Sequence, residues 1–206
     1  MKILAIGAHP DDLEYGCGGT LSKFCKKGNK IHLLVMTKGE IGGNPRLRLA
    51  EQRNAAKALG ANVSWGNFND TCIPLNKVII NKIENAIKKI GPELIFVHYP
   101  EDTHQDHRNV SQATVTATRY FRNVLFYEVP TTVNFVPTVF VDIGDYLKEK
   151  DRLLRRHSSQ VHVTRVAGLS ILESANASAI FRGFQNRVKY AEGFVPLRLA
   201  LDFEYK

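Results

Sequence analysis

The chain has 206 residues, of which 44% are hydrophobic and 23% are charged. This length and composition predict one globular domain with a buried core and exclude a disordered chain. The sequence contains no run of about 18 apolar residues and no long apolar segment near its N-terminus, so we expect neither a transmembrane helix nor a secretory signal. A cytoplasmic location is the resulting expectation.

The three cysteines and the net charge narrow the class of protein further. Cys17, Cys25 and Cys72 form no C-x-x-C pair, which argues against a disulfide framework and against a cysteine-built zinc site. The formal net charge is +8, and residues 148–198 hold ten Lys/Arg against four Asp/Glu. A solvated basic face is the simplest interpretation, with an anionic substrate, an acidic partner surface or nucleic acid as alternatives.

Apolar runs alternate with segments of helical periodicity over the first 130 residues. Strands are predicted at Lys2–Ala8, Ile31–Thr37, Asn62–Trp65, Glu93–Tyr99 and Val124–Val129. Helices are predicted at Gly19–Lys27, Pro45–Leu59, Leu75–Ile90 and Arg108–Arg122. Strands that alternate with helices imply parallel pairing and right-handed crossovers. We therefore predict an α/β fold with a doubly wound, mostly parallel sheet and helices on both faces.

The pattern is less regular after Pro130. A strand at Thr138–Ile143 and helices at Asp145–Arg156 and Val166–Phe181 are predicted, and the last 25 residues carry no clear pattern. No repeat, low-complexity tract or linker divides the chain. We therefore expect a single domain over residues 1–206, with the core in 1–130 and an extension of the same domain in 131–206.

A dense group of polar residues follows the first predicted strand, where residues 8–20 read AHPDDLEYGCGGT. Its neighbouring carboxylates, Asp11 and Asp12, repel each other, and a bound cation would remove that repulsion. The alternative is a polar loop in which one of these acids caps a helix. We expect the stretch to end in a glycine-rich turn, with a helix beginning near Thr20.

A second group follows the predicted strand Glu93–Tyr99, where residues 100–107 read PEDTHQDH. In the common doubly wound order, this strand and the first one flank the point where the winding reverses, and ligands bind there at the carboxyl ends. We therefore expect the two groups to face each other. His104, paired with Asp106, would be held oriented and cationic, which suits the stabilisation of an oxyanion.

Together the two groups contain the ligands of a metal site. His9, Asp12 and His107 supply two imidazoles and one carboxylate, which is the usual protein part of an open catalytic zinc site. Asp11 would then be free to take a proton from water that the metal activates. Iron or manganese could occupy the same ligands.

Both groups resemble the signature of the zinc-dependent N-acetylglucosaminyl deacetylases of the PIG-L/LmbE family. That signature is AHPDDxExGxGG after the first strand and HxDH after a later one, and both stand unbroken here, at residues 8–19 and 104–107. Weaker likeness extends to residues 48–60, 157–160 and 190–194. The resemblance implies a Rossmann-like sheet, one zinc ion per chain and hydrolysis of the acetyl amide of an N-acetylglucosamine-type sugar in a glycoconjugate.

The resemblance also implies a role for each matching residue. His9, Asp12 and His107 would hold zinc, Asp11 would be the general base, His104 would stabilise the tetrahedral intermediate, Asp106 would support His104, and Arg48 would contact the sugar. Arg46 and Arg53 lie close to Arg48 and are alternatives for the sugar contact. Specificity for the rest of the substrate is expected in the loops after the second and fourth strands and in the C-terminal third.

Other functions fit parts of the sequence. A dinucleotide site is excluded by the glycine spacing, which is not G-x-G-x-x-G. A phosphoester hydrolase would use similar ligands, but phosphate chemistry often needs two metals and the ligands suffice for one. The net positive charge suggests a nucleic-acid-binding domain, but aromatic residues are not interleaved with the basic ones. We expect a small-molecule substrate and no nucleic-acid partner, with a homo-oligomer possible.

Overall fold

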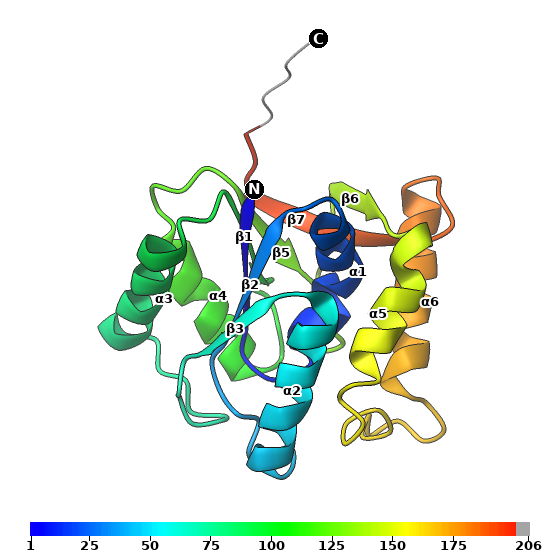
Figure 1. Cartoon of the computed structure of the whole chain (residues 1–206), viewed down its shortest axis with the longest axis horizontal. Helices are drawn as coiled ribbons and strands as arrows, with labels where there is room; N and C mark the ends of the chain where they lie inside the picture. The colour runs from blue at the N-terminus through cyan, green and yellow to red at the C-terminus, as the bar shows by residue number, and fades with distance from the viewer. Residues whose placement is uncertain (201–206) are drawn as a thin grey trace.

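In the computed structural model, which describes residues 1–200, the chain forms one seven-stranded sheet with helices on both faces (Figure 1). The strands are β1 (Lys2–Gly7), β2 (Lys30–Val35), β3 (Asn62–Trp65), β4 (Leu94–His98), β5 (Val124–Tyr127), β6 (Val139–Asp142) and β7 (Ala191–Arg198). The helices are α1 (Asp12–Lys26), α2 (Pro45–Leu59), α3 (Lys77–Ile90), α4 (Gln105–Ala117), α5 (Leu147–Leu154) and α6 (Ile171–Gln185), with a short 3-10 helix, η1, at Gly144–Tyr146.

The strand order is β3-β2-β1-β4-β5-β7-β6, which confirms the predicted doubly wound α/β fold. Strands β1 to β5 are parallel, and the winding reverses between β1 and β4. The loops that follow these two strands therefore meet at the edge where such sheets bind ligands. In Figure 1, β1 begins beside the N label at the top, so this edge lies towards the bottom of the view.

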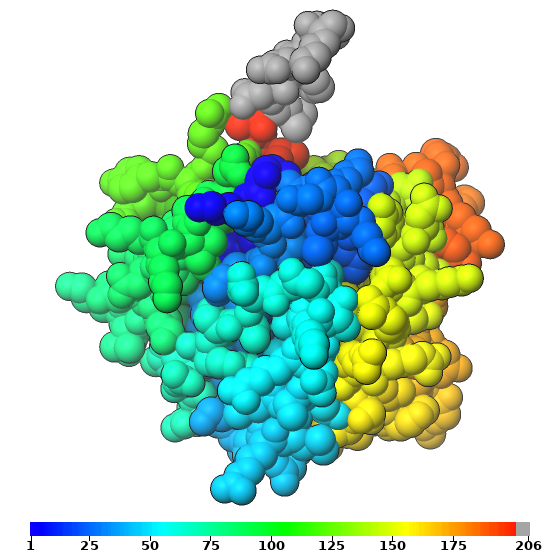
Figure 2. Space-filling view, in the orientation of Figure 1, coloured from blue at the N-terminus to red at the C-terminus, as the bar shows by residue number. Residues whose placement is uncertain are grey.

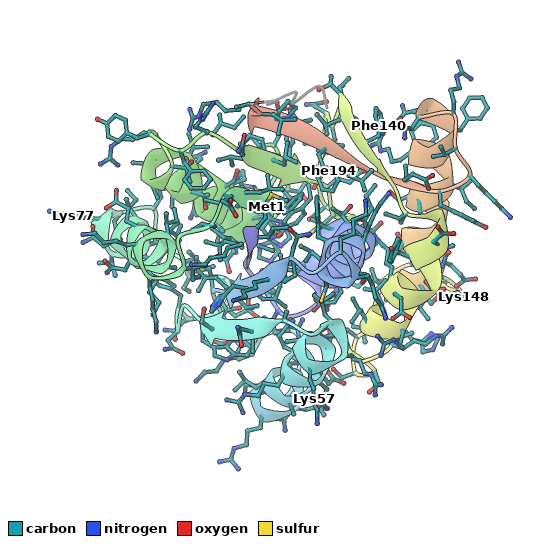
Figure 3. All side chains as sticks on the ribbon, turned by 45° about the horizontal axis from the view of Figure 1, so that its top comes forward. Met1, Lys57, Lys77, Phe140, Lys148 and Phe194 are labelled. Atoms are coloured by element: carbon teal, nitrogen blue, oxygen red, sulfur yellow. The ribbon has the colours of Figure 1, made fainter. Side chains whose placement is uncertain are left out.

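Two clusters of buried side chains form the core, one on each face of the sheet. One cluster joins the sheet to α1, α2, α5 and α6, and the other joins it to α3 and α4. Phe194 of β7 lies in the interior, with its ring 5.1 Å from that of Phe96, whereas Lys57, Lys77 and Lys148 lie at the outside of their helices (Figure 3). Among residues 1–200, no helix has both the length and the apolar character that crossing a membrane requires.

The glycine-rich stretch differs from the sequence prediction of a turn, because it lies inside α1, which begins at Asp12. Close packing explains the glycines: a Cβ on Gly16 would lie 2.2 Å from Cδ2 of Tyr127, and a Cβ on Gly19 would lie 2.9 Å from Cδ1 of Ile143. Glycine has a low intrinsic helix propensity, and tertiary packing overrides it here. The helix that carries Asp12 therefore lies directly against β5 and the segment after β6.

Helix α1 is kinked at Cys17, where φ is −146°. A buried ion pair from the C-terminal part of the chain holds the kink. The Glu192 carboxylate accepts the backbone N–H groups of the second and third residues after Cys17 at 3.0 and 2.7 Å. Nζ of Lys150 donates to Glu192 at 2.5 Å and to the carbonyl of Tyr15. Residues after 130 thus support the helix that begins at the candidate site.

Helices α4 and α6 differ from their predicted positions, and β7 lies in the stretch for which the sequence predicted no element. Helix α4 begins at Gln105, three residues before the predicted start, and α6 spans Ile171–Gln185 because Ser170 and Glu173 form a capping box. The final stretch contains β7, which is antiparallel to both β5 and β6 and places them all in one sheet. The part of that stretch beyond residue 200 lies outside the described residues. The boundary at residue 130 stays a prediction.

Candidate active site

The loop between β1 and α1 carries the first group of polar side chains. Asp11 has a φ of 92°, in the left-handed region that residues other than glycine rarely adopt. Its backbone N–H donates to Oε1 of Gln52 at 3.2 Å, and its Oδ2 accepts from Nη2 of Arg48 at 3.1 Å. Asp12 is the first residue of α1. The bend therefore places one carboxylate on the loop and the next one on the helix.

The loop between β4 and α4 carries the second group. His104 is the N-cap of α4, and its Nδ1 accepts the backbone N–H of Asp106 at 3.2 Å. His107 lies in the first turn of α4. The backbone N–H of His104 donates to Oδ1 of Asp102 at 2.8 Å, which fixes the entry into the helix.

The two loops meet, as the sequence predicts. Nδ1 of His9 lies 3.2 Å from Nε2 of His107 and 3.5 Å from Oδ2 of Asp12. Nε2 of His107 lies 3.5 Å from Oδ1 of Asp12. In a tetrahedral site with bonds of about 2.0–2.1 Å, ligand atoms lie about 3.3–3.4 Å apart. The three buried residues therefore lie close enough together to hold one metal ion.

Carboxylates hold the outer nitrogen of each imidazole. Nε2 of His9 lies 2.9 Å from Oδ1 of Asp70 and 3.2 Å from Oδ2 of Asp106. Nδ1 of His107 lies 3.2 Å from Oδ2 of Asp102. Such partners place the ring proton on the outer nitrogen and orient the other nitrogen toward a metal. The donor chemistry of the site thus fits a cation between the two inner nitrogens and Asp12.

Two further groups contact the Asp12 carboxylate. Its Oδ2 accepts the backbone N–H of His9 at 2.7 Å and lies 3.0 Å from Nε2 of His98. The ring of His98 stacks on that of His107, with centroids 4.0 Å apart and an interplanar angle of 9°. Complete burial is the largest influence on His98 and lowers its pKa to about 4. His98 is therefore neutral, and it donates to the Asp12 carboxylate in the tautomer whose proton lies on Nε2.

Sequence reasoning did not single out Asp70, His98 or Asp102. Asp102 lies within the PEDTHQDH stretch, but its position offered no specific role. His98 is the last residue of the apolar strand β4, and Asp70 lies in the loop after β3. Only their position in the sequence could have indicated these residues. Each of the three lies at the carboxyl end of a strand or after it, and doubly wound sheets bind ligands at that edge.

The two adjacent acids titrate differently. Burial raises the pKa of Asp11 to about 6, although Arg48 lowers it. Burial is the largest single influence on Asp12 and acts to raise its pKa, but His107, His98 and His9 together outweigh burial and hold that pKa well below its usual range. For His107, burial lowers the pKa, and Asp12 and Asp102 reverse this and raise it to about 9. Asp12 is therefore ionised as a ligand must be, and a metal would compete with the proton on His107.

The side chains of His104 and Asp106 are arranged differently from the predicted pair. The Asp106 carboxylate accepts two backbone N–H groups of the loop after β3, at 2.7 and 3.2 Å, and contacts His9. Burial, followed by His9 and His107, lowers the pKa of His104, so this imidazole is neutral and not cationic. Because its Nδ1 accepts a hydrogen bond, its proton lies on Nε2. That N–H can still donate to an oxyanion.

Arg48 connects three parts of the site. Its Nη1 donates to the carbonyl of Gly39 at 2.9 Å, and its Nη2 donates to the carbonyl of Pro10 at 2.8 Å and to Asp11. The side chain is 6% exposed. The guanidinium thus positions the Asp11 carboxylate and the loop after β2. The sugar contact expected from the resemblance stays a prediction.

A cavity of about 420 Å³ opens above these residues. Its size is within the usual range for small-molecule sites. All of the predicted site residues except Asp106 line it, namely His9, Asp11, Asp12, Arg48, His104 and His107. Asp106 is fully buried behind His9. The structure therefore brings the two sequence motifs together at the floor of one cavity.

A second group of ligand atoms, from His9, His104 and Asp106, also lies within 4.8 Å of one another. It shares His9 with the first group. Its carboxylate already accepts two backbone N–H groups, which uses much of its capacity to bind a cation. His9, Asp12 and His107 are therefore the stronger metal candidates.

Comparison with known protein families agrees with this geometry. The family model PIG-L, described as GlcNAc-PI de-N-acetylase, matches residues 4–118. The chain belongs to the PIG-L family. The matched range contains every site residue that the sequence predicts, from His9 to His107. Residues after 118, including α5, α6 and the loop between them, lie outside the range that the family model matches.

Relatives support the assignment over more of the chain. A protein of Escherichia coli K12 named uncharacterized deacetylase YaiS is 39% identical over 167 residues, which cover 76% of this chain and 90% of YaiS. Diacetylchitobiose deacetylase of Thermococcus kodakarensis is 29% identical over 186 residues, which cover 77% and 70%. The crystal structure of the conserved protein TT1542 from Thermus thermophilus has a TM-score of 0.87 at 27% identity, over 98% of this chain and 96% of that one. This PIG-L protein is therefore an amide-hydrolysing deacetylase.

Proposed function

We propose that this PIG-L deacetylase removes the acetyl group of an N-acetylglucosamine-type sugar in a glycoconjugate, with one bound zinc ion. The observation that carries the proposal is the convergence of His9, Asp12 and His107 at the cavity floor, beside a separate acid, Asp11. The description of the family model and the name of the Thermococcus relative support an N-acetylated amino sugar. A cytoplasmic location and a small molecule as the partner, without nucleic acid, belong to the same proposal.

Nδ1 of His9, Nε2 of His107 and the Asp12 carboxylate would hold the ion. Two imidazole nitrogens and one carboxylate suit zinc, and iron or manganese can use the same donors. When bound, such an ion acts as a Lewis acid that polarises the amide carbonyl and activates water.

Three side chains of the chain would carry out the proton transfers and stabilise charge. Asp11 would accept a proton from the attacking water and pass it to the sugar nitrogen as the C–N bond breaks, which yields acetate and a free amine. Nε2–H of His104 would donate to the carbonyl oxygen as negative charge develops there. Asp106 would support His104 through its backbone N–H, which donates to Nδ1 of the imidazole at 3.2 Å.

An asparagine in place of Asp70 is expected to weaken zinc binding about 10- to 100-fold while the protein stays folded. Asp70 lies 2.9 Å from Nε2 of His9, and its negative charge favours the proton on that nitrogen. Competition between zinc-loaded protein and a chromophoric chelator measures the affinity, with the exposed Asp145→Asn variant as control. An unchanged zinc affinity in Asp70→Asn would show that this carboxylate does not orient the ligand.

The proposed reaction is tested by a screen for amine release. Purified protein of measured metal content is incubated with N-acetylglucosaminides of different aglycones, and free amine and acetate are quantified. We expect equal amounts of both products, loss of activity with a chelator and recovery with about one equivalent of zinc.

Two results would favour the other functions. Hydrolysis of phosphoesters with two metal ions per chain, and no amine release, would indicate a phosphoesterase. Steeply salt-dependent binding to generic DNA or RNA, again without amine release, would indicate a nucleic-acid-binding protein.

A further inference from the structure

The mouth of the cavity carries exposed aliphatic side chains, which we call the apolar rim. It consists of Ile41, Val163, Val166 and Leu169, and all four line the cavity. Their exposed fractions are 70%, 58%, 57% and 37%. Single exposed apolar residues are ordinary on a protein surface, but a group of them around one opening is typical of a binding site.

Two distant segments of the chain build the apolar rim. Ile41 follows β2, and the other three residues lie between α5 and α6. Nε2 of Gln160 donates to the carbonyl of Gly42 at 3.3 Å, which links the two segments. Figure 2 shows the corresponding surfaces, blue to cyan for the first segment and yellow to orange for the second, side by side. The apolar rim is therefore part of the folded structure of this chain.

The loop that carries Val163 and Val166 is held by its own hydrogen bonds. The backbone N–H of Ile171 donates to the carbonyl of Val161 at 2.9 Å and closes the base of the loop. Oγ1 of Thr164 lies 2.6 Å from the carbonyl oxygen of Leu169, to which it donates. Val161 is buried and anchors the loop. These contacts fix the loop with its aliphatic side chains at the cavity mouth.

The cavity thus has a charged floor and an apolar mouth. A substrate amide must reach Asp11 and His104 at the floor, so the parts of the substrate furthest from the amide extend towards the mouth. The hydroxyl groups of a sugar find no polar partner in aliphatic side chains. An apolar group attached to the sugar would instead remove both its own surface and that of the apolar rim from water.

We propose that the apolar rim binds the aglycone, and that the substrate of this enzyme carries an alkyl or aryl aglycone on its N-acetylated sugar. The inference rests on the proposed function, and it adds a preference that the catalytic residues do not determine. Arg165, which also lines the mouth, offers the rival interpretation of an anionic aglycone. Gln160 and Thr164 also line the cavity, but both already donate to backbone carbonyls. Four aliphatic side chains beside one charged group therefore favour the apolar aglycone.

The test compares methyl, butyl and hexyl N-acetylglucosaminides. We expect kcat/KM to rise about two- to fourfold for each methylene that reaches the apolar rim. In the double variant Val163→Ser/Val166→Ser, the ratio of kcat/KM for the hexyl to the methyl glycoside should fall towards 1. Val136→Ser is the matched control, because Val136 is 74% exposed and lies outside the lining of this cavity.

Three results would overturn the inference. The first is a kcat/KM that is independent of alkyl length. The second is a preference for a carboxylate-bearing aglycone that Arg165→Ala abolishes. The third is a gain from a longer N-acyl chain, with no gain from a longer aglycone, which would make the apolar rim an acyl site.

A binding measurement separates this inference from the proposed function. Calorimetric titration of the Asp11→Asn protein with the same glycosides does not require turnover. Affinity that rises with alkyl length and falls in the double serine variant supports the apolar rim even if no glycoside is hydrolysed. Equal affinity for methyl and hexyl glycosides contradicts it even if both are hydrolysed.

Discussion

Asparagine in place of Asp11 is expected to leave the metal content unchanged and to lower kcat about 10²- to 10⁴-fold, the range for a lost general base. Asparagine has the same shape and tolerates the left-handed backbone of this position, where φ is 92°. Its side-chain oxygen can still accept the hydrogen bond from Arg48. The variant therefore removes the proton acceptor and retains the loop. Metal analysis and steady-state kinetics on an N-acetylglucosaminide measure both effects.

The exposed Asp145→Asn variant is the matched control and should behave as the unmodified protein. Full turnover by metal-loaded Asp11→Asn protein would exclude Asp11 as the base. Loss of the metal in this variant would instead make Asp11 a ligand, in conflict with the geometry around Asp12.

Alanine in place of His9 is expected to remove metal and activity together. His9 would supply one of three protein ligands. Loss of a residue that only orients a metal ligand weakens metal binding by up to about 100-fold, so loss of the ligand itself should weaken zinc binding by more than that. The same change leaves Asp70 and Asp106, with 5% and 0% exposed side chains, without their imidazole partner. Both carboxylates keep backbone N–H donors, but a buried charge that loses its ionic partner is destabilised, so Tm should also fall. Metal analysis and thermal unfolding followed by circular dichroism test these effects.

His32→Ala is the matched control, because His32 lies on β2 and does not line the active-site cavity. If His9→Ala fails to fold, His9→Gln retains a polar side chain towards Asp70 and allows the metal measurement. A His9 variant that keeps one tightly bound zinc ion and full activity would show that the metal lies elsewhere.

Local patterns in the sequence were sufficient for most of the fold. The bounds of α2 and β3 are those predicted. For α2 the reason is local, because Pro45 begins the helix and Gly60, with a φ of 79°, ends it. The switch point between β1 and β4 followed from alternating strands and helices together with the common doubly wound strand order. The convergence of His9, Asp12 and His107 followed in turn, because both motifs come directly after these strands.

Other features depend on contacts between residues far apart in the chain. The glycines of α1 indicated a turn, and only the side chains of Tyr127 and Ile143 explain why they lie in a helix. Val166 was predicted as the start of a helix, whereas the structure places it on an exposed loop. The identity of a single apolar residue does not show whether it lies on a helix face or at the mouth of a cavity.

The sequence by itself determined the order of strands and helices along the chain, the reaction class that the two motifs indicate and the residues that we propose as metal ligands. Only the tertiary structure decided that Nδ1 of His9 and Nε2 of His107 face each other, that Asp70 and His98 support them, and that aliphatic side chains surround the entrance. The physical reason is the separation along the chain of the residues that interact. Strands, helices and caps form from interactions within a few residues, whereas ring orientation, burial and cavity shape arise from side chains that only the folded chain brings together.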